Sequence, residues 1–324
     1  MLPAEDATFA VAALSALPSP EQLPSIDPDT GSPEHRGPPC LSRALPLGQA
    51  VQHALLAVAA RADELGRCGQ QDVADHIHAL RRVMRQAQAL VRLIAPGLVG
   101  DKTAKQPLQR IAVTARTLSK ARDAEVLPEA WAALPLPVQH ATSAIALFLQ
   151  QERLILYADA KTLADLQKAA HSAAAINRKF AAALPPQLPA NLVGEGLRTA
   201  LGRVATAHKQ ARKRPRPEAV HDLRKACKDV RHQLEWLGAD AALSLHQALV
   251  DYLKALGGVT DLFALDRWLR QAGRACPPDE RATLRLALDK LVSKSTGKQI
   301  ARCGGWMDGK PKKLAKRLVA DLGW

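Results

Sequence analysis

Apolar residues recur at helical spacing through most of the chain from residue 47 onward. The pattern predicts one helix over 47–65, ending at Gly66, and a longer one over about 71–95, ending before Pro96 and Gly97. Further helices are predicted over about 105–121, 123–133, 138–157 and 161–183. Residues 1–46 are rich in Pro, Ser and acidic residues, which predicts a flexible tail with at most one short helix over Ala10–Leu17.

Two of the predicted helices carry a cationic stripe opposite their apolar face. At about 100° per residue, the basic side chains of each helix fall within roughly 120° of one another. The first stripe comprises His78, Arg81, Arg82 and Arg85, and the second comprises His221, Arg224, Lys225, Lys228 and Arg231. Arg92 extends the first stripe by one turn, and Gln88 stands where the second stripe has Arg231.

The stripes concentrate charge of one sign, whereas an ordinary solvated helix mixes signs to form i,i+4 pairs. One such stripe could arise by chance, but two with the same pattern indicate a polyanionic partner. Arg guanidinium groups bind phosphate oxygens through paired hydrogen bonds, and Lys supplies adjustable point charges. A stripe of about 15 Å, at 1.5 Å rise per residue, suits a linear polyanion.

The order of landmarks repeats after the Pro-rich stretch at 184–189. Leu118–Asp123 in the first half matches Leu256–Asp261 in the second, and Asp159–Lys161 matches Asp308–Lys310. The predicted organisation is therefore a tail over 1–46, a first helical bundle over 47–190 and a second, homologous bundle over 191–324. A pseudo-twofold arrangement would place both stripes on a shared basic groove or cavity.

Composition supports an all-α fold. The chain has 324 residues, of which 47% are hydrophobic and only 3% aromatic. Its apolar content is mostly Ala and Leu, which favour helices over strands. The net charge of +14 indicates an anionic partner, such as nucleic acid, acidic lipid or a phosphate polymer. The scarcity of aromatics disfavours single-stranded nucleic acid, whose bases stack on such side chains.

The cysteines indicate neither a disulfide framework nor a zinc site, because the five are far apart and show no CxxC spacing. Cys227 lies on the apolar face of its helix, where it is expected to pack as a small hydrophobe. These features suit a reducing cytoplasm. The N-terminus shows no signal-peptide pattern, and no apolar run of about 18 residues predicts a transmembrane segment.

From about residue 47 to 324, the chain resembles the CHAD (conserved histidine α-helical domain) proteins. The resemblance rests on the His-x-x-Arg-basic-x-x-basic pattern of both stripes, on Leu118–Asp123, on Lys310-Pro311 and on the terminal Trp324. It implies paired helical bundles with a basic central cavity that binds inorganic polyphosphate; some family members are found on polyphosphate granules. It also implies that the nine residues of the two stripes are binding residues. Further contacts expected beside them are Arg92, Arg116, Lys120, Lys161, Lys254 and Lys310.

Other functions remain open. His221-Asp222 matches the dipeptide of HD metal phosphohydrolases, but the first stripe has Ala79 at the Asp position and the neighbouring cations would repel a divalent metal. The triphosphatase motif Glu-x-Glu-x-Lys of CYTH domains, which accompany some CHAD domains, is also missing. The expected protein is therefore a binder with no enzymatic activity, cofactor or metal. Nucleic acid and anionic membrane are the alternative partners, and a granule-coat role is compatible with polyphosphate binding.

Overall fold

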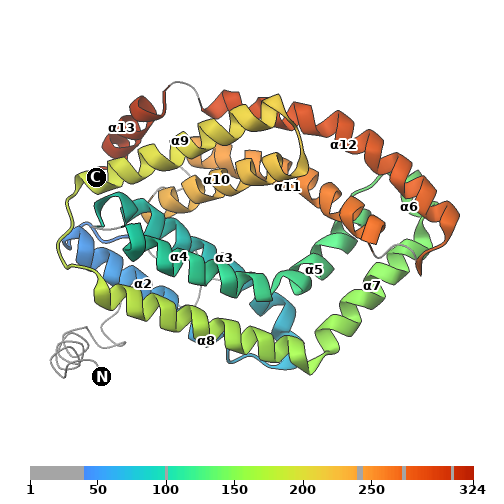
Figure 1. The fold of residues 1–324 in the computed structure, drawn as a ribbon, viewed down its shortest axis with the longest axis horizontal. Helices are drawn as coiled ribbons and strands as arrows, with labels where there is room; N and C mark the ends of the chain where they lie inside the picture. Colours follow the sequence, from blue (N-terminus) through green and yellow to red (C-terminus); the bar gives the residue numbers. More distant parts are fainter. Residues whose placement is uncertain (1–39, 99–100, 239–243, 272–274, 308–309) are drawn as a thin grey trace.

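The computed structural model describes residues 40–98, 101–238, 244–271, 275–307 and 310–324. Every regular element in these ranges is a helix, which confirms the all-α prediction (Figure 1). Most of the predicted tail, including Ala10–Leu17, lies outside the described residues.

The first half of the chain forms seven α-helices among the described residues. They are α2 (Leu47–Leu65), α3 (Val73–Ile94), α4 (Asp101–Thr117), α5 (Ser119–Ala132), α6 (Leu136–His140), α7 (Ser143–Ala158) and α8 (Ala160–Ala183). Short 3-10 turns flank α3 at Gln70–Asp72 and Ala95–Gly97. Helix α2 has the predicted bounds, and α3 differs from its prediction by only one or two residues at each end.

Two helix boundaries differ from the predictions. The predicted break near residue 122 lies at Leu118, directly after Thr117, whose hydroxyl donates to the carbonyl of Thr114 at 2.8 Å. The single helix predicted over 138–157 is two helices, separated at Thr142. The Thr142 hydroxyl donates to the carbonyl of Val138 and accepts from the indole of Trp131. Such local side-chain bonds compete with continued helix, and hydrophobic periodicity does not reveal them.

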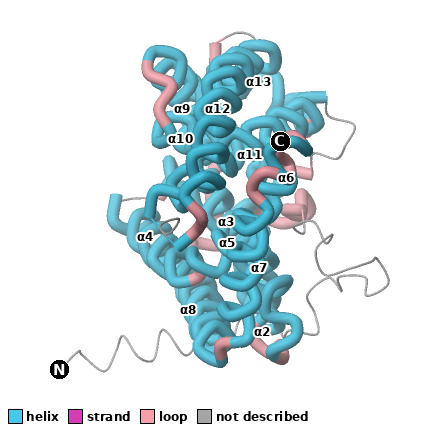
Figure 2. Tube along the Cα trace, turned by 90° about the vertical axis from the view of Figure 1, so that its right-hand side faces the viewer, coloured by secondary structure: helices cyan, strands magenta, loops and turns pink. Residues whose placement is uncertain are grey.

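The second half of the chain forms five α-helices among the described residues. They are α9 (Asn191–Lys213), α10 (Pro217–Trp236), α11 (Ser244–Gln271), α12 (Pro278–Trp306) and α13 (Pro311–Asp321). Two of them, α11 and α12, are the longest helices in the described ranges. The Pro-rich stretch at 184–189 connects α8 to α9, as expected of a helix-breaking segment. Along one edge of the molecule lie α9, α12 and α13, along the opposite edge α2 and α8, and between them α3, α10 and α11 (Figures 1 and 2).

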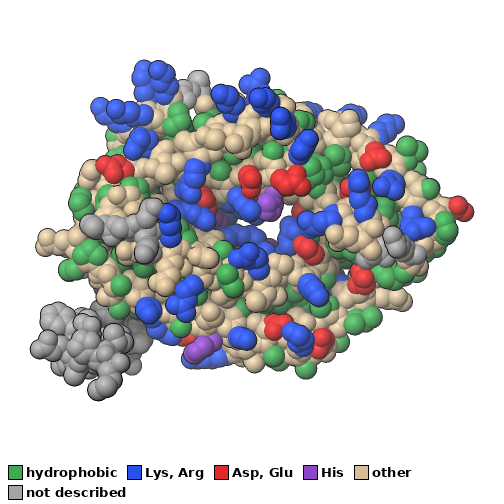
Figure 3. Space-filling view, in the orientation of Figure 1, with side chains coloured by type: hydrophobic (Ala, Val, Ile, Leu, Met, Phe, Trp, Pro, Cys, Tyr) green, Lys and Arg blue, Asp and Glu red, His purple; other side chains and the backbone are tan. Residues whose placement is uncertain are grey.

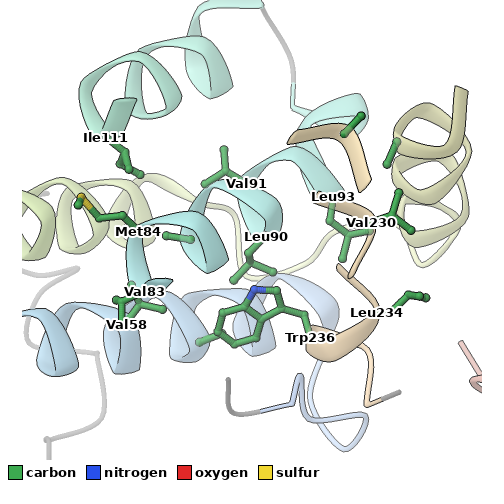
Figure 4. Close-up of a cluster of buried hydrophobic side chains, with 14 of the residues drawn as sticks. Val58, Val83, Met84, Leu90, Val91, Leu93, Ile111, Val230, Leu234 and Trp236 are labelled. Carbon is green, nitrogen blue, oxygen red and sulfur yellow. The ribbon is translucent and has the colours of Figure 1, made fainter. Parts of the chain in front are cut away.

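One large hydrophobic cluster joins helices from both halves of the chain. Its centre is the contact between α3 and α10, where Trp236 packs beside Leu90 (Figure 4). Trp236 also donates its indole N–H to the carbonyl of Gln86 at 2.9 Å, and the Gln233 amide donates to the carbonyl of Ala89 at 3.2 Å. The two stripe helices are therefore fixed against each other by apolar burial and by satisfied polar anchors.

Helix α9 approaches α3 closely at Gly196. A Cβ atom at this position would lie 2.0 Å from the carbonyl oxygen of Leu93, so the close approach requires glycine. A second, smaller cluster is formed by side chains of α5, α7, α11 and α12, again from both halves. The division into two homologous bundles at residue 190 stays a prediction.

Candidate anion-binding site

The molecule is hollowed near the centre of the face seen in Figure 3. The opening lies between α10 and α11 on one side and α3 and α5 on the other, and Lys and Arg side chains gather around it (Figures 1 and 3). Because the apolar faces of α3 and α10 pack into the core, their basic side chains are left to face this space.

Six half-buried cations from three helices act on one another here, and we call them the central cluster. They are Arg81 and Arg85 of α3, Arg122 of α5, and Arg224, Lys228 and Arg231 of α10. The cluster thus brings together members of both predicted stripes, which are far apart in the sequence.

Burial and neighbouring positive charge together lower the pKa of Arg85 and Lys228. Desolvation, followed by the charges of Arg81 and Arg224, lowers the pKa of Arg85 to about 9. Desolvation, followed by the charges of Arg85 and Arg224, lowers the pKa of Lys228 to about 5. The Lys228 amine is therefore mostly neutral at pH 7, and a bound anion would favour its protonation.

Three carboxylates offset part of the cluster's charge. Arg122 donates to Asp123 at 3.0 Å and to Asp261 of α11 at 3.3 Å. Arg231 forms an ion pair with Glu235 at 2.9 Å. Burial raises the pKa of Asp261 despite the nearby Arg224 and Arg122, so this carboxylate gives up charge more readily than an exposed one. With Lys228 mostly neutral at pH 7, the five guanidinium groups still outnumber the three carboxylates, so the cluster keeps excess positive charge.

Some hydrogen-bond donors of the cluster have no acceptor among the described residues. The Nε atoms of Arg81 and Arg224 are buried and have no hydrogen-bond partner among the described residues. Arg224 lies against α11, where a Cβ atom added to Gly257 would stand 3.2 Å from its Nη2. Glycine at this position leaves the guanidinium room beside the helix.

The two predicted histidines are both exposed, at the first turns of their stripes. Desolvation, followed by the charges of Lys225, Arg224 and Arg122, lowers the pKa of His221 to about 4, although Asp222 opposes the shift. His221 is thus electrostatically part of the central cluster and is neutral at pH 7 in the unliganded chain.

The structure separates some stripe residues from the cluster. Arg92 and Lys225 line a groove of about 580 Å³ between α9 and α10. There, Asp229 accepts from Arg92 at 2.7 Å and lies 3.7 Å from Arg203, while Lys225 lies 3.7 Å from Asp222. These cations are already paired with carboxylates, in contrast to Arg85 and Lys228.

The remaining predicted residues lie on or near the surface. Arg82 is half-buried in α3. The five further secondary contacts, all exposed, are Arg116, Lys120, Lys161, Lys254 and Lys310. Lys161 forms an ion pair with Asp165 at 2.8 Å. Gln88 donates to the carbonyl of Leu108 at 3.4 Å and so contacts α4. The charges that dominate at Arg85 and Lys228 come from none of these residues.

Sequence reasoning missed Arg122. This residue lies within Leu118–Asp123, which the sequence comparison of the two halves had singled out, yet only Lys120 was assigned within that segment and Arg116 just before it. Arg122 is the residue that connects α5 to the cluster and to Asp261 of the matching segment in the second half. Its place in that repeated segment was the available signal.

Other predicted features can be located as well. Cys227 is fully buried in the core, as its place on the apolar face predicted. Asp222 of the HD-like dipeptide is exposed beside Lys225. In the ranges that the structure describes, no group of three or more His, Cys, Asp or Glu residues is placed to hold a metal ion. Within the same ranges, none of the helices combines the length and apolar character needed to cross a bilayer.

Comparisons with known proteins agree with the predicted resemblance. The model of the CHAD domain family matches residues 49–270. The fold is similar to the crystal structure of the CHAD domain from the plant Ricinus communis, with a TM-score of 0.60 and 17% sequence identity, over 85% of this chain and 94% of that chain. No curated protein matches the sequence. Because the family match spans more than half of its residues, the chain belongs to the CHAD family.

Proposed function

We propose that this protein binds inorganic polyphosphate through the central cluster. The observation that carries the proposal is the gathering of half-buried basic groups around Arg85 and Lys228, at which the charges that lower the pKa are all those of neighbouring arginines. Burying charge without a counter-charge is costly, so such an arrangement is best explained by a ligand that supplies anions. The CHAD family, which is linked to polyphosphate binding, supports the same ligand.

The chemistry requires recognition and no bond cleavage. Phosphate oxygens would accept hydrogen bonds from the guanidinium groups of Arg81, Arg224 and Arg122, including the two buried Nε donors without partners. Lys228 would gain its proton as the phosphate approaches. Polyphosphate is flexible and carries about one charge per phosphate. Its successive phosphates can lie beside successive donors of α3 and α10, since donors on these helices are repeated at each turn.

A slender polymer fits this site better than the alternative polyanions do. The cluster's side chains are half-buried within an opening between helices, whereas a duplex or a membrane presents its phosphates on a broad surface. Such a surface can reach protruding cations but not cations set back between α3, α5 and α10. For longer chains, the groove between α9 and α10 would extend the path, where phosphates would compete with Asp229 for Arg92 and with Asp222 for Lys225.

The direct test is a titration with polyphosphate of defined length at about 50 to 200 mM salt. Binding should be tight at low salt, and log affinity should fall linearly with log salt concentration as counterions are released. Duplex DNA at matched phosphate concentration should not displace the polyphosphate from the central cluster. Absence of polyphosphate binding at the lowest salt would contradict the proposal.

Location on polyphosphate granules can be tested in cells that make them. A fluorescently tagged chain should coincide with stained granules, and an Arg85→Glu, Lys228→Glu variant should be diffuse. A variant that stays on the granules would separate localisation from the central cluster.

A further inference from the structure

A second concentration of positive charge lies far along the chain from the stripes. Between residues 290 and 324 the sequence contains nine Lys and Arg residues but only two acidic residues, Asp308 and Asp321. This segment follows the part matched by the family, which ends at residue 270. Of its nine cations, only Lys310 was assigned as a contact of the stripes, and none belongs to the central cluster.

Helix α12 contributes a straight row of exposed cations, Lys290, Lys294, Lys298 and Arg302. Successive members are four residues apart, so they project from one side of the helix. The row spans about 18 Å at 1.5 Å rise per residue. Arg302 donates to Gln299, and the three lysines form no ion pair with a carboxylate of the described residues.

Helix α13 adds further exposed cations, Lys312, Lys313, Lys316 and Arg317. Its apolar side, with Leu314 and Leu318, packs against α9, which turns the basic side outward. Helix α9 in turn touches α12, where His208 contacts the carbonyl of Ile300 at 3.1 Å. The basic sides of α12 and α13, here called the outer basic surface, thus belong to one packed edge of the molecule.

The outer basic surface protrudes, whereas the central cluster is set back. Helices α12 and α13 lie along the outer edge, and Lys and Arg side chains project from that edge (Figures 1 and 3). A protruding helix can lie against a wide polyanion that could not enter the central opening.

We infer that the outer basic surface binds the phosphate backbone of duplex nucleic acid. Duplex DNA carries about one charge per 1.7 Å of axis, so the α12 row can lie opposite roughly ten phosphates. The described side chains from 290 to 324 include no large, exposed hydrophobic residue, although such residues commonly anchor a protein in a membrane interface. Contacts of Lys and Arg with phosphates alone predict binding that is independent of base sequence.

The test uses a labelled duplex of about two helical turns and measures anisotropy across salt concentration. The variant Lys290→Gln, Lys294→Gln, Lys298→Gln should bind the duplex about tenfold or more weakly. Its slope of log affinity against log salt should fall by about 2 to 3, since each lost phosphate contact removes about 0.9. Its affinity for short polyphosphate should equal that of the wild type.

The matched control removes three exposed cations elsewhere, with Arg67→Gln, Lys168→Gln and Lys179→Gln. If the control loses as much duplex affinity as the α12 variant, net charge explains the binding and the inference is wrong. Absence of duplex binding by the wild type would also overturn it. The inference would also be wrong if the α12 variant lost binding to anionic vesicles but kept its affinity for duplex, since the outer basic surface would then bind membranes.

A third variant separates this inference from the proposed function. Arg85→Gln with Lys228→Gln should lose polyphosphate binding and keep duplex binding. A wild-type chain that binds duplex through α12 but never binds polyphosphate would refute the proposed function and leave the inference intact. If the Arg85, Lys228 variant loses duplex binding and the α12 variant keeps it, the duplex binds at the central cluster and the inference is wrong.

Discussion

Reversing two charges of the central cluster, with Arg85→Glu and Lys228→Glu, is expected to weaken polyphosphate binding about 1,000-fold or more. Each hydrogen bond to a charged group contributes about 1.5 to 3 kcal/mol, and the new carboxylates would also repel the ligand. A combined loss of about 4 kcal/mol or more corresponds to three decades of affinity. Isothermal titration calorimetry with polyphosphate of defined length measures the loss.

The reversed variant should nevertheless fold. Each new glutamate would lie among the remaining arginines of the cluster, so repulsion in the unliganded chain is replaced by attraction, and the thermal midpoint should not fall. The matched control is Lys168→Glu with Lys179→Glu, an equal change of charge on the exposed side of α8. Equal losses in the two variants would show that affinity depends on net charge and not on the central cluster.

Polyphosphate affinity is expected to rise as pH falls from about 8 toward 5, by up to about tenfold per pH unit where Lys228 alone is linked to binding. The pKa of Lys228 in the unliganded chain is about 5, so the amine carries little charge at pH 7. A bound phosphate raises that pKa, and the complex therefore holds a proton that the free chain lacks. The dependence should flatten near the unliganded pKa, because both states are then protonated.

Proton uptake can be measured directly by calorimetry in buffers with different ionisation enthalpies. Uptake of up to one proton is expected at pH 7 for the wild type and much less for Lys228→Arg, which stays charged throughout. His221→Gln should keep most of the uptake at pH 7, because bound phosphate would have to raise the pKa of His221 from about 4 to above its ordinary value of about 6.5 for a full proton to be taken up there. If Lys228→Arg keeps the wild-type pH dependence, another group carries the proton.

Hydrophobic periodicity and charge pattern were sufficient to predict the two stripe helices, but Arg122 of α5 lay in the predicted break between two helices. The bounds of α2 and α3 follow from apolar spacing and from glycine and proline signals, and the core positions of Leu80, Val83 and Val230 follow from the same spacing. The breaks at Leu118 and Thr142 were not predictable in this way, because local hydroxyl bonds and a tryptophan contact mark them.

Membership of the cluster was only partly predictable. A helical projection gives the side of the helix on which Lys225 and Arg92 lie, but not the helix that packs beside them. In the structure, α9 lies next to both residues and Asp229 pairs with Arg92. Arg122 is the opposite case, because it belongs to the cluster although neither predicted stripe contains it. Nothing in the pattern around it places α5 beside α11, since that contact depends on how the helices pack.

The basic groups of α3 and α10 repel one another in the unliganded chain. Binding of a polyanion should therefore raise the chain's free energy of unfolding. Any polyanion that binds only the folded chain stabilises it by about 2.7 kcal/mol at a free concentration 100 times its dissociation constant. An anion that offsets the uncompensated charge of Arg85 among the neighbouring arginines is one source of that binding energy. The unliganded protein would unfold, and be degraded, more readily than the loaded one. Its abundance in a cell would then follow the supply of polyphosphate without any separate regulator.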